Sequence, residues 1–180
     1  MKTKIWLKPN TYIYLALLLL LVPFPWLAAW LIAVIFHELC HWLSVRLCGG
    51  VVEWVTVAIG GANMQSSGLS DGRRLLCILS GPVGGLVLIL LQRWIPRIAI
   101  CSWLLSMYNL LPVLPLDGGR ALQIILRKNE VFYFIERCVL VLLTTIAFFA
   151  AFCLRLGILP LLIAGILWLK NRKTPCIERL

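Results

Sequence analysis

The stretch VIFHELCHWLSV, residues 34–45, places ionisable side chains inside an apolar run. His37 and His41 are the only 2 histidines of the chain, and Glu38 stands between them. Ionisable groups in apolar surroundings are costly and need partners, such as a metal ion or a hydrogen-bonding group. The pattern therefore indicates a functional site within an apolar segment.

The spacing His-Glu-x-x-His is typical of a zinc site on a helix. Residues four apart project from one helix face, so His37 and His41 can bind one zinc ion. Glu38 follows the first ligand and can reach a water on the metal, where a general base is needed. Zinc lowers the pKa of such a water to about 7. Two histidines buried by accident in a helix bundle are the competing explanation, but random placement gives this spacing only about once in a hundred.

The composition places this motif in a membrane protein. Hydrophobic residues make up 62% of the 180 residues and charged residues 13%, which excludes an ordinary soluble domain. A membrane span needs about 20 apolar residues, and several nearly uncharged segments approach that length. The net charge of +10 does not indicate nucleic-acid binding, because the basic residues are scattered beside apolar segments. We therefore expect an all-α polytopic membrane protein.

The apolar region 12–47 can be interpreted as one span, as two spans, or in part as a cleaved signal peptide. The continuing apolar sequence favours retention of its first segment, and Pro23 and Pro25 indicate a turn. With two spans here, most Lys and Arg residues fall on one side of the membrane, and the positive-inside rule makes both termini cytosolic. The six predicted spans are residues 11–23, 26–46, 74–92, 97–116, 131–152 and 155–169.

A catalytic zinc site also needs a third protein ligand and an open position for water. Most remaining carboxylates fall in predicted loops, helix ends or the tail, namely Glu53, Asp71, Glu130, Glu136 and Glu178. Asp117 differs because it ends the predicted helix 97–116, where Pro112 and Pro115 disrupt the helix. The predicted topology puts Asp117 and His41 at comparable depth near the cytosolic face. A solvated aspartate in a helix-terminating turn is the competing explanation.

The two motifs together, HELCH at residues 37–41 and NLLPVLPLDGG at residues 109–119, resemble the site-2 protease family of intramembrane zinc metalloproteases. The compact chain is most similar to the stage IV sporulation protein FB type. The resemblance implies that His37, His41 and Asp117 are the ligands of one Zn²⁺ and that Glu38 is the catalytic base. It also implies that Asn109 helps to hold the substrate.

Residues 51–65, VVEWVTVAIGGANMQ, predict a small β-hairpin on the cytosolic side. Most of the stretch is β-branched or alternating, and Gly60 and Gly61 interrupt it. Proteases bind extended substrates, so a strand edge here could pair with one, and Gly60 and Gly61 are candidate substrate-binding residues. A surface hairpin without a substrate role is an equal alternative.

These features predict a zinc metalloendopeptidase of the plasma membrane that cleaves membrane-tethered proteins near the inner leaflet. The resemblance implies a pro-sigma or anti-sigma factor as substrate, in sporulation or stress signalling, and a regulatory membrane protein as a further partner. We expect a single domain over residues 1–180, without a PDZ or CBS domain. A catalytically silent membrane chaperone or metal-regulated binding protein is the alternative, although Glu38 argues against it. Conductance or metal transport is a third, disfavoured because the ionisable residues converge on one site.

Overall fold

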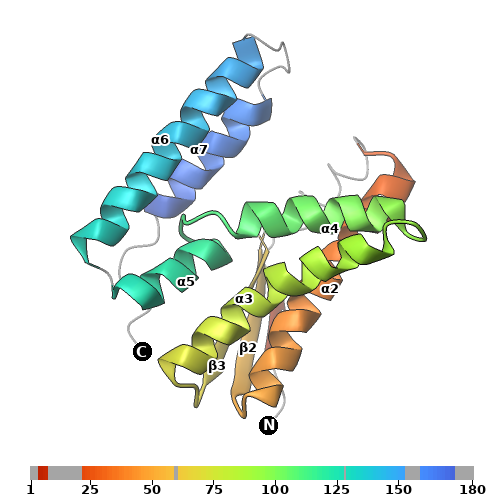
Figure 1. Ribbon diagram of the computed structural model, residues 1–180, viewed down its shortest axis with the longest axis vertical. Helices are drawn as coiled ribbons and strands as arrows, with labels where there is room; N and C mark the ends of the chain where they lie inside the picture. Colours follow the sequence, from red (N-terminus) through yellow and green to blue (C-terminus); the bar gives the residue numbers. More distant parts are fainter. Residues whose placement is uncertain (1–3, 8–21, 59–60, 128, 153–158, 173–180) are drawn as a thin grey trace. The chain divides into compact units, whose positions relative to one another are not determined.

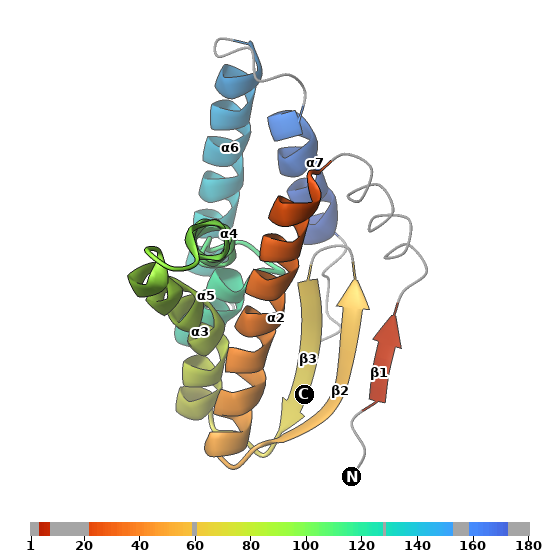
Figure 2. The ribbon, with the colours of Figure 1, turned by 90° about the vertical axis from the view of Figure 1, so that its right-hand side faces the viewer.

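The structure, a computed structural model, describes residues 4–7, 22–58, 61–127, 129–152 and 159–172. Their backbone contacts divide the chain into two units, Met1–Tyr108 and Asn109–Leu180, which are described one after the other. Figure 1 labels helices α2 to α7 and strands β2 and β3, and Figure 2 also labels β1. The assignment of residues 1–180 to a single domain stays a prediction.

Helix α2 (Phe24–Leu47) carries the His-Glu-x-x-His motif. It begins directly after Pro23, and Pro25 occupies its first turn, where a missing backbone N–H costs nothing. The helix ends at Leu47, and Gly49 follows with φ +80°, a left-handed conformation that glycine adopts without steric cost. The turn predicted from the prolines is therefore the start of this helix.

A three-stranded sheet lies beside α2 in the order β1-β2-β3 (Figure 2). Strands β2 (Val51–Ala58) and β3 (Gly61–Ser67) are antiparallel, which confirms the predicted hairpin. Strand β1 (Lys4–Leu7) runs parallel to β2 and was not predicted. Buried Val52 packs with Val45 of α2 and Cys77, so the sheet shares a small apolar core with the helices.

Helix α3 (Asp71–Val87) packs along α2 and continues into the 3₁₀ turn η1 (Leu88–Leu91) (Figure 1). Glycines make the close approach possible, since a side chain at Gly84 would overlap the Cys40 thiol. Helix α4 (Pro96–Asn109) follows, and its Ser102 hydroxyl donates a 3.0 Å hydrogen bond to the Gly85 carbonyl.

The second unit begins at Asn109, the last residue of α4, and continues with a non-helical segment at residues 110–116. Helices α5 (Asp117–Leu126), α6 (Glu130–Phe152) and α7 (Leu159–Arg172) follow, and α6 and α7 pack side by side (Figure 1). The predicted helix 97–116 was wrong at its C-terminal end, because helix α4 stops at Asn109. Pro112 and Pro115 explain the early stop, since proline lacks an N–H and disfavours helix in the residue before it.

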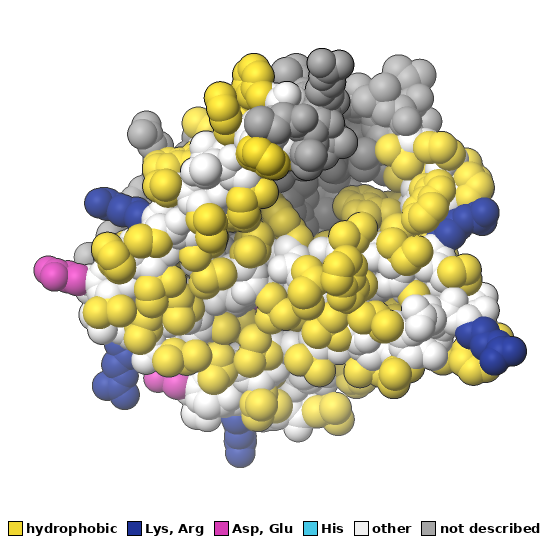
Figure 3. All heavy atoms as spheres, turned by 45° about the horizontal axis from the view of Figure 1, so that its top comes forward, with side chains coloured by type: hydrophobic (Ala, Val, Ile, Leu, Met, Phe, Trp, Pro, Cys, Tyr) yellow, Lys and Arg dark blue, Asp and Glu magenta, His cyan; other side chains and the backbone are white. Residues whose placement is uncertain are grey.

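Three helical segments among the described residues are long and apolar enough to cross a membrane: Phe24–Leu47, Asp71–Leu91 and Glu130–Phe152. They match three of the predicted spans, and their length and composition support a membrane location. The predicted span 11–23 lies almost wholly outside the described residues. Helices α4 and α7 have only 14 residues each, so the structure does not show six spans. Hydrophobic side chains cover much of the face drawn in Figure 3, as lipid contact requires.

Candidate metal centre

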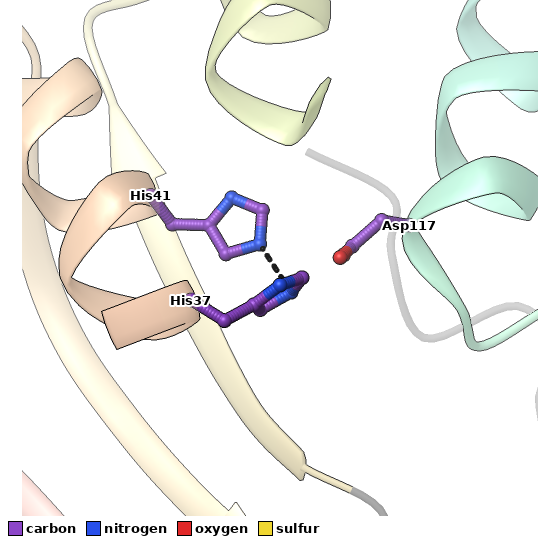
Figure 4. Close-up of side chains that lie close together, drawn as sticks. All are labelled: His37, His41 and Asp117. Atoms are coloured by element: carbon purple, nitrogen blue, oxygen red, sulfur yellow. Dashed lines mark hydrogen bonds between the residues drawn. The ribbon is translucent and has the colours of Figure 1, made fainter. Parts of the chain in front are cut away.

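His37 and His41 lie one turn apart on α2 and direct their imidazole rings toward each other (Figure 4). Their Nε2 atoms are 3.2 Å apart, and the ring planes are nearly perpendicular, at 84°. His37 is buried, with 3% of its surface exposed. The predicted helical spacing therefore brings two nitrogen donors to one point.

The orientation of His41 is set by helix α3. Its Nδ1 atom lies 2.8 Å from the Cys77 carbonyl oxygen, and because a carbonyl can only accept, Nδ1 carries the proton. Nε2 of His41 is therefore the nitrogen that keeps its lone pair, which could be donated to a metal ion. A backbone carbonyl that fixes the tautomer of a histidine in this way is a common feature of metal sites.

A serine pair strengthens the same helix contact. The Ser80 hydroxyl lies 2.7 Å from the Cys77 carbonyl and 2.7 Å from the Ser44 hydroxyl. Ser44 in turn donates to the His41 carbonyl over 2.9 Å. The backbone and the ring of His41 are thus both tied, through Ser44 and Cys77, to one stretch of α3.

Gly81 leaves the space that the His41 ring fills. A Cβ atom at residue 81 would overlap the ring, with Nε2 as the nearest atom. The ring is held by the Cys77 carbonyl, so it could not move aside without losing that hydrogen bond. Gly81 is therefore a part of the site that the sequence analysis did not identify.

Glu38 is half-buried on α2, directly after His37 and three residues before His41. The three-residue spacing makes Glu38 and His41 neighbours on the helix surface. Its position fits a proton acceptor beside the metal ligands.

Asp117 is half-buried and is the first residue of helix α5, not the last residue of α4 as predicted. The preceding segment closes tightly on this helix start. A Cβ atom at Gly118 would overlap the Leu110 carbonyl, and one at Gly119 would overlap the backbone of Val113. Two glycines in succession are therefore required to bring the backbone of residues 110–116 against the first turn of α5.

Asp117 belongs to the second unit and the two histidines to the first, so its assignment as the third metal ligand stays a prediction. Two imidazoles and a carboxylate are a donor set that zinc accepts. Zinc–nitrogen distances of about 2.0–2.1 Å in a tetrahedron place two nitrogen ligands about 3.3 Å apart. The 3.2 Å between the Nε2 atoms of His37 and His41 fits that value.

The other predicted site residues are only partly described. Asn109 is the last residue of α4 and is half-buried. Gly61 is the first residue of β3, whereas Gly60 lies outside the described residues. Their assignment to substrate binding stays a prediction.

The environment of Glu136 differs from the predicted one. It was predicted at a helix end, but it is the seventh residue of α6 and only 4% exposed. Its spacing of four from the buried residues Phe132 and Leu140 was the available signal, since these three residues share one helix face.

No family model and no curated protein matches the chain. Among solved structures, the chain is similar to the site-2 protease from Methanocaldococcus jannaschii, with a TM-score of 0.65. The sequences are 18% identical, and the match covers 94% of this chain and 89% of that one. The similarity shows that the two chains share a fold.

Proposed function

We propose that this chain is an intramembrane zinc metalloprotease of the site-2 protease type. The observation that carries the proposal is the histidine pair, with its Nε2 atoms 3.2 Å apart and the tautomer of His41 fixed by the Cys77 carbonyl. Asp117 supplies the third ligand, and the shared fold with a site-2 protease supports the same assignment.

In the proposed chemistry, different residues bind the metal, transfer the proton and position the substrate. His37, His41 and Asp117 hold the zinc ion, which when bound supplies a Lewis acid and lowers the pKa of water. Glu38 accepts the proton of the attacking water and passes it to the leaving amine nitrogen of the scissile bond. Asn109 positions the substrate by hydrogen bonding.

We infer that the substrates are membrane-tethered proteins cut near the inner leaflet. The motif helix α2 is one of the three helices that can span a membrane, and Arg46 in its last turn favours the cytosolic side. The proposed location is the plasma membrane, with several spans and both termini cytosolic. A pro-sigma or anti-sigma factor is the proposed substrate class.

The sheet offers a place for an extended substrate. Strand β2 is central, so β3 is an edge strand whose outer side has no strand partner among the described residues. An unwound substrate segment can pair with such an edge through main-chain hydrogen bonds. Gly61, the first residue of β3, would then lie at one end of the bound segment, and Gly60 is proposed to bind it as well.

The test is co-expression with candidate membrane-tethered substrates, comparing the native chain with Glu38→Gln. The native chain should release a shortened soluble product, and the variant should not. Equal product from both would contradict the role of Glu38. A native chain that binds zinc but cleaves none of the substrates tested would favour a metal-regulated binding protein or chaperone.

A further inference from the structure

Helix α6 buries a carboxylate that the proposed chemistry does not use. Glu136 is 4% exposed, between Phe132 at 0% and Leu140 at 2%. The helix is one of the three that can span a membrane. A carboxyl group is expensive to bury there, so a hydrogen bond that it makes points to its role.

One hydrogen bond of this carboxylate joins it to the backbone of the segment before Asp117. The Leu114 N–H donates a 2.8 Å hydrogen bond to Oε1 of Glu136. Within the segment, the N–H groups of Val113 and Leu116 donate to nearby carbonyls, of Leu111 and Val113 respectively. The Leu114 N–H instead donates to a side chain 22 residues further along the chain.

Anchoring Leu114 constrains the start of helix α5. Val113 and Leu116 are buried, at 0% and 4%, and Gly118 and Gly119 pack against the backbone of the segment. Only Pro115 and Leu116 separate Leu114 from Asp117. A shift of the Leu114 amide would therefore be passed to Asp117 by tightly packed backbone.

We propose that Glu136 is a positioning residue for the metal ligand Asp117. Its carboxylate fixes the Leu114 amide and so the direction in which α5 presents Asp117. This inference rests on the proposed zinc site. It adds a requirement to the zinc site, because Glu136 is not one of the three proposed ligands.

The reach of the side chain, rather than its charge, should determine the effect. Glu136→Gln keeps an acceptor oxygen at the same distance from Cα, whereas Glu136→Asp keeps the charge but is one methylene shorter. Glu136→Ala removes the acceptor. Leu140→Ala is the matched control, because it opens the same buried face one turn away and keeps the acceptor of the Leu114 N–H.

The experiment measures the zinc dissociation constant of the purified full chain by competition with a chelator. It also measures hydrogen exchange of the Leu114 amide in the metal-free protein. Glu136→Gln should bind zinc almost as tightly as the native chain. Glu136→Asp and Glu136→Ala should bind about 10–100-fold more weakly, as loss of an outer partner of a ligand does. The Leu114 amide should exchange faster in these two variants and not in Leu140→Ala.

The outcomes separate this inference from the proposed function. Equal zinc affinity in the native chain, Glu136→Asp and Glu136→Ala would overturn the positioning role and leave the zinc site intact. Tight binding by Glu136→Asp with weak binding by Glu136→Gln would overturn it too, since charge would then matter more than reach. If Glu136→Ala does not fold, the zinc affinities of Glu136→Gln and Glu136→Asp still test the positioning role. A native chain without zinc affinity would overturn both proposals.

Discussion

The Nδ1 atom of His41 donates a 2.8 Å hydrogen bond to the carbonyl oxygen of Cys77. It joins the motif helix α2 to helix α3, so the direction of the His41 lone pair depends on the packing of two helices. The ligand pair is therefore local in sequence, but its orientation is a tertiary property. Substitutions in α3 should change metal binding although α3 contributes no ligand.

Gly81→Ala should lower zinc affinity by about 10-fold or more, because the new methyl group overlaps the His41 ring. The ring would have to turn away from the orientation in which Nε2 can bind the metal. Chelator competition on the purified chain measures the change. Gly72→Ala, in the first turn of the same helix, is the control, since its new Cβ would meet nothing within 4 Å beyond its chain neighbours and its own helix backbone. Native zinc affinity in Gly81→Ala would contradict the described packing.

Glu38→Gln should keep zinc bound and slow peptide-bond cleavage by about 100–10,000-fold, the usual range for loss of a general base. Metal analysis and cleavage of a co-expressed substrate, on the same preparation, separate the two effects. Glu53→Gln, an exposed glutamate of β2, is the control and should retain full activity. Loss of zinc in Glu38→Gln would mean that Glu38 acts as a ligand.

The topology prediction concerns the loops. Reporter fusions at Pro25 and Pro96 should be extracytosolic, whereas fusions at Gly68 and at the C-terminus should be cytosolic, since the positive-inside rule places the basic residues there. The fusions expected on one side of the membrane serve as controls for the fusions expected on the other side. An extracytosolic C-terminus would show that residues 12–47 do not contain two spans.

The position of the cut follows from the same topology. Substrates trapped with Glu38→Gln and then exposed to the native chain should be cleaved near the inner leaflet, because the proposed topology makes the motif end of α2 the cytosolic one. Mass spectrometry of the released product locates the bond. Cuts clustered at the outer surface would contradict both the topology and the proposed product.

The parts of the site that the sequence predicted are those with short-range causes. The His37–His41 pair follows from four-residue spacing on a helix, and the β2–β3 hairpin follows from local alternation. Pro112 and Pro115 correctly indicated a break, but the local pattern did not reveal that Asp117 starts a new helix.

The parts that were missed depend on contacts between distant residues. Strand β1 has four residues and exists through its pairing with β2, about fifty residues away along the chain. The burial of Glu136 depends on the segment around Leu114, and the role of Gly81 depends on the ring of His41. Such pairings cannot be read from local spacing.

The zinc content of the purified chain tests the central claim most directly. The native chain should hold about one zinc ion with three protein ligands, and His37→Ala and Asp117→Ala should each hold much less. Asp71→Ala is the matched control for Asp117, because Asp71 is also the first residue of a helix but is exposed. Zinc content in His37→Ala and Asp117→Ala equal to that of the native chain and Asp71→Ala would contradict the proposed metal centre.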